Sequence, residues 1–335
     1  MDEKKKKKKW PVILAAFLLL VGVGVGGAFG VVNHYLDKIN DADVSQQDII
    51  PPEEETFGDE SEIQAEPVQP DQPVEEPESV VWEGVQPIDC DDLINIMLVG
   101  QDRRAGQGRQ RSDAMILCSI NPKTKEVALI SFLRDLYVTI PGKYSDNRLN
   151  ATYVFGGFPL LDATLMENFG IPVDYNVEVD FDGFEAIIDS VGGIDVNVSA
   201  AEAKYLGWSA GMNHLNGEEA LNFARIRKLD SDFNRTGRQR EVLMAVFQKV
   251  RGQSLGQLLN TVETVLPYVT TDMSNGEMIG LATKLFPVLS GADIDSHHIP
   301  AKGTYRSASI RGMSVLVPNL SANRKLLVEE YLPLS

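Results

Sequence analysis

The chain has 335 residues, of which 43% are hydrophobic and 24% are charged, and its formal net charge is −17. This composition is typical of a globular protein, and the length is sufficient for a sizeable hydrophobic core. Proteins that bind nucleic acid through its phosphates normally carry a basic domain, so the acidic balance argues against a nucleic-acid partner. The four histidines lack the spacing of metal ligands or of a catalytic triad, and we expect neither.

An uncharged segment of 22 residues, Pro11–Val32, follows six consecutive lysines. A helix rises about 1.5 Å per residue, so this segment is long enough to span the hydrocarbon core of a membrane, which is about 30 Å thick. The lysines predict that residues 1–10 stay cytoplasmic and that the chain after the transmembrane helix, residues 11–32, is exported. A cleaved signal peptide is the alternative, but its apolar region is normally shorter, and no clear cleavage site follows.

Residues 33–87 have the composition of a linker. Residues 41–80 contain 14 acidic residues, several prolines and no lysine or arginine. Such a segment cannot bury enough apolar surface to offset the entropy of ordering, so we expect a disordered, acidic, proline-rich stalk. Residues 88–335 are then the extracytoplasmic domain, held at the cell membrane.

Residues 88–335 mix strand-like and helix-like patterns. Residues 93–100 are an apolar run typical of a buried strand, residues 114–120 and 126–133 flank a turn and predict a hairpin, and residues 135–142 continue the sheet. Further strands are expected at 173–181, 194–198, 294–299 and 313–317, and helices at 150–170, 182–193, 216–224, 236–252, 256–266, 274–290 and from 319. This order predicts an α/β fold, a single α-β-α sandwich domain with a central mixed sheet. Cys90 and Cys118 could form a disulfide outside the cell, but buried free thiols are favoured.

Charged residues follow the ends of the first predicted strands. Asp102 and Arg104 come after the first strand, Arg111 and Asp113 open the second, and Arg134 ends the third. Carboxylates at the mouth of a sheet can hold Mg²⁺, which takes one or two carboxylates together with substrate phosphates. Each of these residues, and Arg148 in a later loop, is individually compatible with a cap or a surface salt bridge.

The segment "ARIRKLDSDFNRTGRQR", residues 224–240, concentrates arginines in an acidic chain. Arg225 and Arg227 can share a face only if the preceding helix ends near Ala224. Arg235, Arg238 and Gln239 have the spacing of one face at a helix start. Cations there oppose the helix dipole unless an anion is bound, so the segment predicts a site for a multiply charged phosphate such as pyrophosphate, with Asp232 orienting the guanidinium groups or capping the helix. A solvated charged helix start is the alternative.

With these residues identified, the chain resembles the LytR–CpsA–Psr family of bacterial cell-wall proteins. The resemblance rests on ordered segments at matching spacing: "NIMLVGQDRR…QRSDAMIL", "LISFLRDLYVTIPG", "RLNATYVFGG", "VDFDGFEAIIDSVGGIDVNV" and "LNGEEALNFARIR…SDFNRTGRQR". It covers residues 90–252 densely. The chain departs from the usual pattern at "SFLRD", at "GQD" and at Arg148, where the family commonly has lysine. "SFLRD" and Arg148 keep the charge, so we expect little change in the chemistry, and the differences bear more on substrate fit than on reaction type.

The resemblance implies an enzyme that transfers an anionic glycopolymer, such as teichoic acid or capsular polysaccharide, from a polyprenyl-pyrophosphate carrier to peptidoglycan through a phosphodiester bond. It implies that Asp102 and Asp113 hold Mg²⁺, or Mn²⁺, and that Asp102, Asp113 and Arg134 are catalytic. The implied pyrophosphate-binding residues are Arg111, Arg134, Arg225, Arg227, Arg235 and Gln239, and the supporting residues are Asp232, Arg104, Arg148 and Arg238. The expected partners are the lipid-linked polymer, peptidoglycan and membrane lipid, and the resemblance implies an envelope of the Gram-positive type. A hydrolase of the lipid-linked glycan and a non-catalytic carrier-binding or regulatory protein are the alternatives.

Overall fold

The structure, a computed structural model, describes residues 40–41, 49–52, 73, 75–82, 84–101, 103, 108–227, 229, 231–251, 257, 261, 264–289 and 293–334. The predicted cytoplasmic tail and transmembrane helix, most of the predicted linker, and Asp102 and Arg104 lie outside these residues. Among the helices within the described ranges, none is both long and apolar enough to cross a membrane.

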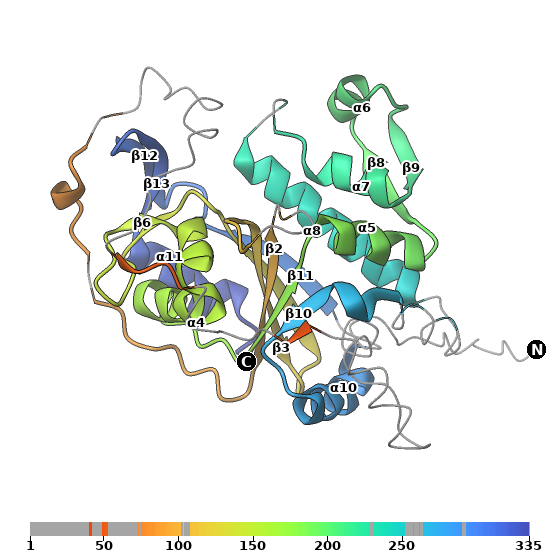
Figure 1. The fold of residues 1–335 in the computed structure, drawn as a ribbon, viewed down its shortest axis with the longest axis horizontal. Helices are drawn as coiled ribbons and strands as arrows, with labels where there is room; N and C mark the ends of the chain where they lie inside the picture. Colours follow the sequence, from red (N-terminus) through yellow and green to blue (C-terminus); the bar gives the residue numbers. More distant parts are fainter. Residues whose placement is uncertain are drawn as a thin grey trace, which may run out of the picture.

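A seven-stranded mixed sheet forms the centre of the domain, in the order β1-β10-β7-β2-β3-β4-β11 (Figure 1). The strands are β1 (Asn40–Asp41), β10 (Val269–Thr271), β7 (Tyr175–Val179), β2 (Ile94–Gln101), β3 (Ser112–Asn121), β4 (Glu126–Phe132) and β11 (Asp293–Ile299). Strand β3 is antiparallel to both β2 and β4, whereas β7 pairs parallel with β2 and β11 pairs parallel with β4. The predicted mixed α/β architecture and the β3–β4 hairpin are confirmed.

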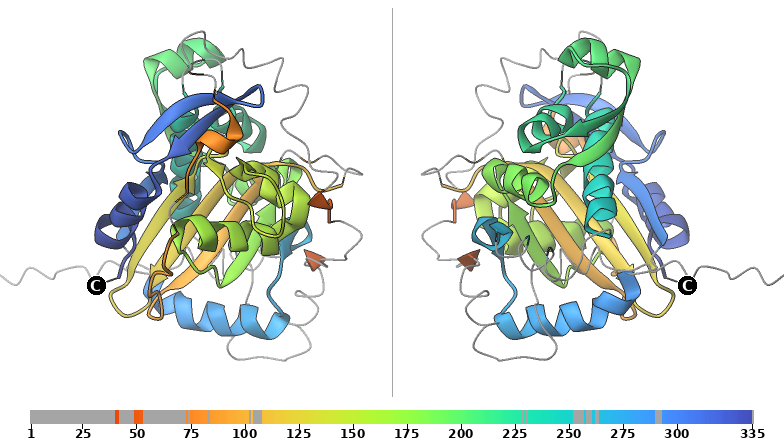
Figure 2. Two further views of the ribbon diagram at one scale, coloured as in Figure 1. Left: turned by 90° about the vertical axis from the view of Figure 1, so that its left-hand side faces the viewer. Right: turned by 90° about the vertical axis from the view of Figure 1, so that its right-hand side faces the viewer.

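Helices cover both faces of the sheet (Figures 1 and 2). Helices α4 (Leu149–Phe169) and α11 (Leu320–Leu326) pack on one face, and α5 (Phe181–Ser190), α7 (Gly217–Ala224) and α8 (Asp232–Arg251) pack on the other. Alternation along β2 explains both cores, because Ile94 and Ile96 point to the α5–α7–α8 face while Met97 and Val99 belong to the α4 face. Strands that are buried on both faces consist mainly of apolar residues, and the sequences of β2, β3 and β4 show this pattern.

The remaining elements lie around this core. They are η3 (Pro77–Ser79), β5 (Tyr137–Val138), β6 (Asn147–Arg148), β8 (Ile194–Val198), α6 (Ala200–Leu206), β9 (Gly211–Leu215), η4 (Leu266–Tyr268), α10 (Asn275–Leu289), β12 (Tyr305–Ile310), β13 (Met313–Pro318) and η5 (Leu327–Tyr331). Helix α4 contains a break at its two adjacent glycines, since Gly156 and Gly157 have non-helical backbone angles and Gly157 has φ 62°.

One predicted strand pairs with a different partner from the one expected. Residues 135–142 do not continue the central sheet, because β5 within them pairs with β6 in a separate two-stranded sheet. The chain turns away after Phe132, and β11 takes the place beside β4. Strands β1, β6, β9, β10 and β12 were not predicted. Strands β1 and β6 have only two residues each and β10 has three, while β9 and β12 each pair with a single partner.

Several pieces of the predicted linker contact the domain. Residues Asn40–Asp41 pair with β10, and the Ile50 amide donates to the Phe155 carbonyl at 2.8 Å. The Glu75 amide donates to the Ser309 carbonyl of β12 at 2.9 Å. The described parts of residues 33–87 therefore lie against the domain. Cys90 and Cys118 are both buried free thiols, as favoured from the sequence.

Candidate functional site

Three strand ends meet at one edge of the sheet, because β3 runs antiparallel to both β2 and β4. The β2–β3 register shifts there: Gly100 pairs with Ala114 but Gln101 pairs with Ser112, so Asp113 is an extra residue in a β-bulge. Met115, two residues later, belongs to the core under α4, whereas Asp113 lines a cavity on the opposite face. The bulge therefore redirects Asp113, as bulges next to functional sites often do.

Two arginines hold the Asp113 carboxylate. Arg134, which follows β4, lies 3.0 Å from Oδ1 through Nη1, and Arg227, which follows α7, lies 2.8 Å from Oδ2 through Nη2. Burial opposes ionisation of Asp113, but the positive charges of Arg134, Arg227 and Arg235 outweigh it and hold the pKa of Asp113 below its ordinary value. Asp113 is therefore ionised at neutral pH, and Arg134, only 2% exposed, is fixed as a buried cation.

A second carboxylate enters the same cluster from α8. Asp232 Oδ1 lies 2.6 Å from Arg235 Nη2 and 3.8 Å from Arg134 Nε. Burial raises the pKa of Asp232 to about 6; the nearby acids Asp135 and Asp113 add to this effect, and Arg235 opposes it. Within the described residues, Asp232 Oδ2 and Arg235 Nε are buried without a hydrogen-bond partner. Such unsatisfied buried groups are rare in folded proteins and mark a place where a ligand can bind.

An apolar cavity of about 170 Å³ opens beside this cluster, between the sheet and helices α5, α7 and α8. Its walls are mainly aliphatic and aromatic, and its polar lining consists of Asp113, Asp180, Arg225, Arg227, Arg235 and Gln239. The Arg225 guanidinium stacks 4.1 Å from the centroid of the Phe181 ring. Gln239 Oε1 is buried without a hydrogen-bond partner in the described part of the chain. An apolar cavity with arginines at its polar end suits an amphiphilic ligand with an anionic headgroup.

Two of the other predicted site residues, Arg148 and Arg111, do not line the apolar cavity. Arg148 Nη1 lies 3.5 Å from Asp135 Oδ1, and its Nη2 donates to the Ser314 carbonyl at 2.7 Å, so it links the cluster to β13. Arg111 Nη1 lies 3.5 Å from Asn150 Oδ1.

Arg238 does not join Arg235 and Gln239 as their spacing on α8 suggested. Its Nη1 lies 3.2 Å from Glu202, and its Nη2 donates to the Ile226 carbonyl at 2.7 Å. Arg238 thereby positions the backbone between Arg225 and Arg227, because Glu202 of α6 and the Ile226 carbonyl together hold its guanidinium group away from the cavity lining. Asp102 and Arg104 lie outside the described residues.

Sequence reasoning missed a second polar cluster around Glu178, which is 3% exposed in β7. Its carboxylate accepts hydrogen bonds from Gln101 and Tyr153, and Arg103 Nη2 lies 3.2 Å away. Gln101 Oε1 in turn accepts from the Gln110 amide at 2.9 Å, which orders the chain leading to Arg111. Burial, reinforced by the neighbouring Glu178 charge, raises the pKa of Tyr153 well above its ordinary value. The position of Glu178 in a predicted strand could have revealed this cluster, because an acidic residue in an internal strand must be buried and paired.

Asp113 has the chemistry to contribute to a divalent-cation site, together with Asp102, the second expected ligand, which lies outside the described residues. A metal-binding carboxylate must be ionised, and the low pKa of Asp113 meets this requirement. The described residues contain no group of three or more His, Cys, Asp or Glu side chains that could hold a metal ion. Two carboxylates completed by substrate phosphates are nevertheless a usual Mg²⁺ donor set.

Comparison with known proteins places this geometry in context. A model of the LytR_cpsA_psr family matches residues 58–327. The polyisoprenyl-teichoic acid–peptidoglycan teichoic acid transferase TagU of Bacillus mycoides (strain KBAB4) is 35% identical over 192 residues, 56% of this chain and 63% of that protein. TagU of Bacillus licheniformis (strain ATCC 14580) is 39% identical over 166 residues, 48% of this chain and 54% of that protein. The chain thus spans less than two thirds of the length of these relatives.

Solved structures share the fold. TagT bound to LIIa-WTA superposes with a TM-score of 0.59 at 28% identity, covering 74% of this chain and 94% of TagT. Bacillus subtilis TagV superposes with a TM-score of 0.58 at 31% identity, covering 72% of this chain and 99% of TagV. The match of the family model over residues 58–327 includes the whole arginine and carboxylate cluster, and the chain belongs to the LytR–CpsA–Psr family.

Proposed function

We propose that this chain transfers an anionic glycopolymer, such as teichoic acid, from a polyprenyl-pyrophosphate carrier to a hydroxyl of peptidoglycan. The observation that carries the proposal is the junction of a buried arginine cluster with an apolar cavity, because one amphiphilic ligand can occupy both. A polyprenyl pyrophosphate has a polyanionic head for Arg134, Arg227 and Arg235 and an isoprenoid tail for the cavity. The transferase names of the TagU relatives support the same reaction class.

The reaction follows from the charges. An acceptor hydroxyl attacks the phosphorus nearer the glycan, an oxygen–phosphorus bond forms, and the bond to the bridging oxygen breaks, so that polyprenyl phosphate leaves. Negative charge grows on the phosphoryl and bridging oxygens, and the fixed guanidinium groups of Arg134 and Arg235 stabilise this charge without reorganisation. When bound by Asp113 and Asp102, Mg²⁺ (or Mn²⁺) would supply additional charge stabilisation for the phosphoryl oxygens.

The hydroxyl proton needs an acceptor. Asp113 is a weak base, because two arginines hold its carboxylate. Asp232 has one buried oxygen that no hydrogen bond occupies among the described residues, so we assign the proton to Asp232 Oδ2. Arg111, Arg225 and Gln239 would complete the headgroup site, while Arg104, Arg148 and Arg238 would support it. A transmembrane helix at residues 11–32 would keep the domain at the outer face of the membrane, where the carrier lies.

Radiolabelled polyprenyl-pyrophosphate glycan, peptidoglycan strands and Mg²⁺, incubated with the full chain in detergent, test this proposal. We expect label on peptidoglycan, and its loss in Asp113→Asn and Asp232→Asn. Label released into water at the same rate with or without peptidoglycan would instead identify a hydrolase. Carrier binding without product from a donor and acceptor that TagU can use would identify a non-catalytic protein.

A further inference from the structure

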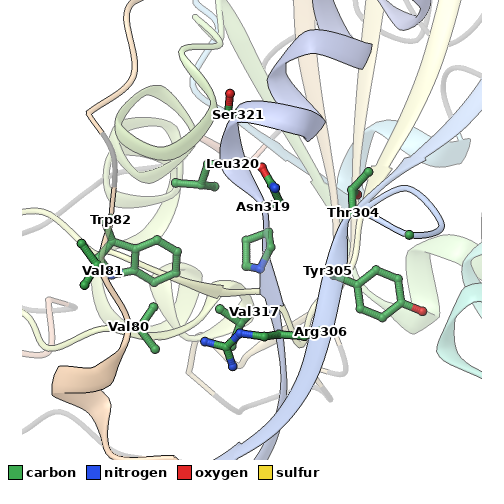
Figure 3. A pocket seen from close by; sticks show the side chains of 12 residues that line it. Val80, Val81, Trp82, Thr304, Tyr305, Arg306, Val317, Asn319, Leu320 and Ser321 are labelled. Carbon is green, nitrogen blue, oxygen red and sulfur yellow. The ribbon is translucent and has the colours of Figure 1, made fainter.

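A second cavity lies between residues 80–82, the β12–β13 hairpin and the first turn of α11 (Figure 3). Its volume is about 430 Å³, within the range of small-molecule sites. Neither the arginine cluster nor the apolar cavity contributes a residue to it. The proposed chemistry as described above therefore leaves this pocket without a role.

One wall of the pocket belongs to the strap, defined here as residues 75–82, which precedes the predicted domain. The strap runs beside β12, with the Glu75 amide donating to the Ser309 carbonyl at 2.9 Å, and Glu75 also forms an ion pair with Arg306. The Trp82 indole nitrogen donates to Asp146 Oδ2 at 2.5 Å, and its ring lies 6.2 Å from that of buried Tyr137. The indole is thus held in place, with its ring directed into the pocket (Figure 3).

Strand β12 connects the pocket to the arginine and carboxylate cluster. Tyr305 of β12 contributes to the lining of the pocket, and its ring lies on the other side of the strand from Trp82 (Figure 3). The Tyr305 ring centroid lies 5.3 Å from that of Phe233, the residue after Asp232. The backbone makes a second connection, because the Leu316 amide of β13 donates to the Asp135 carbonyl at 2.9 Å. A glycan strand seated against Trp82 and crossing β12 at Tyr305 would extend towards Asp232, the residue assigned to accept the hydroxyl proton.

The lining chemistry favours a carbohydrate that is not strongly anionic. Trp82 presents an aromatic face, and the exposed side chains of Asn319 and Ser321 supply an amide and a hydroxyl at the edge. Arg306 is the single charged residue among the described residues that line the pocket, and Glu75 neutralises it. A polyanionic polymer would gain no net attraction here, whereas a sugar can place its C–H face on the indole and its polar groups on the edge.

We propose that this pocket is the acceptor subsite, where a sugar of the peptidoglycan strand binds while a neighbouring sugar presents its hydroxyl to the cluster. The inference rests on the proposed transferase function and adds where the acceptor is held. It also gives the strap a role, because residues preceding the predicted domain supply the aromatic wall.

The test obstructs the pocket with a large side chain introduced at an exposed position. Ser321→Trp places a large side chain at an exposed position of α11 on the edge of the pocket, and Lys204→Trp makes the same change at an exposed position of α6, which does not line it. A third variant, Trp82→Phe, keeps an aromatic ring but removes the hydrogen bond to Asp146. Transfer rates are measured with the full chain in detergent at varied concentrations of lysozyme-released peptidoglycan fragments and, separately, of lipid-linked donor.

We expect Ser321→Trp to raise the KM for the fragments at least tenfold, with the donor KM and the affinity for the lipid carrier unchanged, and Lys204→Trp to match the wild type. Trp82→Phe should raise the acceptor KM by a smaller factor. An unchanged acceptor KM in Ser321→Trp would overturn the inference and leave the transferase proposal standing. A raised donor KM alone would assign the pocket to the donor polymer and also overturn it.

If the wild-type protein transfers nothing, the proposed function fails, and direct calorimetric titration with the same fragments still tests the pocket. Binding that Ser321→Trp abolishes and Lys204→Trp retains would support a glycan site in a non-catalytic protein. Absence of binding to the wild type, or equal binding to both variants, would refute it.

Discussion

The two faces of the central sheet are both covered by helices and both contain a buried core, but on the α5–α7–α8 face part of the space between sheet and helices is open. On the α4 face, Phe132 packs on Phe169 with ring centroids 5.3 Å apart, and Tyr153 packs on Phe158 at 5.4 Å. On the opposite face, β2, β3, α5, α7 and α8 leave a cavity lined mainly by apolar side chains. Native interiors are normally close-packed, so an apolar cavity with arginines at its polar end indicates a ligand site.

Buried carboxylates show the same contrast. Asp113, beside the cavity, has arginines around it and a lowered pKa. Asp162 of α4 is held by the Asn176 amide, and burial raises its pKa to about 7, with the nearby charge of Asp272 adding to the effect. The surroundings of Asp113 stabilise its negative charge, whereas the surroundings of Asp162 disfavour the charge. This difference distinguishes the charged site beside the cavity from the interior around α4.

The largest effect is expected from Arg134, the buried cation at the end of β4. Arg134→Lys keeps the charge but loses the planar fork, and we expect the transfer rate to fall about 100- to 1000-fold, or roughly 2.7–4 kcal/mol of transition-state stabilisation. Arg240→Lys is the matched control, since Arg240 is also buried but donates to Ser131 and Ser296. An equal rate loss in both variants would mean that the effect arises from folding.

The second prediction compares the effect of truncating a leucine on each face of the sheet. Leu161 of α4 is fully buried against the sheet, whereas Leu243 of α8 lines the cavity and is partly buried. We expect Leu161→Ala to lower the free energy of unfolding by about 3 kcal/mol and Leu243→Ala by about 1 kcal/mol, because a side chain beside a void makes fewer contacts. Urea denaturation of the full chain in detergent measures both, and equal losses would contradict the contrast between the faces.

Much of this organisation was predictable from the sequence. The apolar runs of β2 to β4 and the break at Gly156–Gly157 follow from local pattern, and the arginine spacing predicted that α7 ends near Ala224. The bulge at Asp113 was not predictable, because a register shift depends on the partner strand. The contacts of Arg238 and the docking of the strap on β12 depend on residues distant in sequence, which periodicity does not report.

Filling the cavity should weaken donor binding while leaving the fold intact. Leu243→Trp adds a ring to the apolar wall, and we expect the KM for the lipid-linked donor to rise about tenfold, which corresponds to roughly 1.4 kcal/mol. Unfolding free energy should change by less than about 1 kcal/mol, because the cavity has room for added atoms. Val328→Trp, at a 40% exposed position of η5, is the control. An unchanged donor KM would remove the cavity from the lipid site.

The smallest effect concerns Asp162 and the pH dependence of stability. Its folded-state pKa of about 7 lies above the ordinary value of 3.8, so the folded protein holds this proton more tightly than the unfolded chain does. The stabilisation is complete below about pH 4 and is lost as the pH rises towards 7. Asp162→Asn cannot ionise and can still accept from Asn176, so we expect it to match the wild type at pH 4 and to be more stable by on the order of 1 kcal/mol at pH 8. Urea midpoints of both proteins, measured across this pH range, test the direction of the effect. Parallel curves would show that Asp162 does not cause the pH dependence of stability. If the wild type instead gains stability with pH relative to the variant, the Asp162 carboxylate, like that of Asp113, is stabilised as an anion.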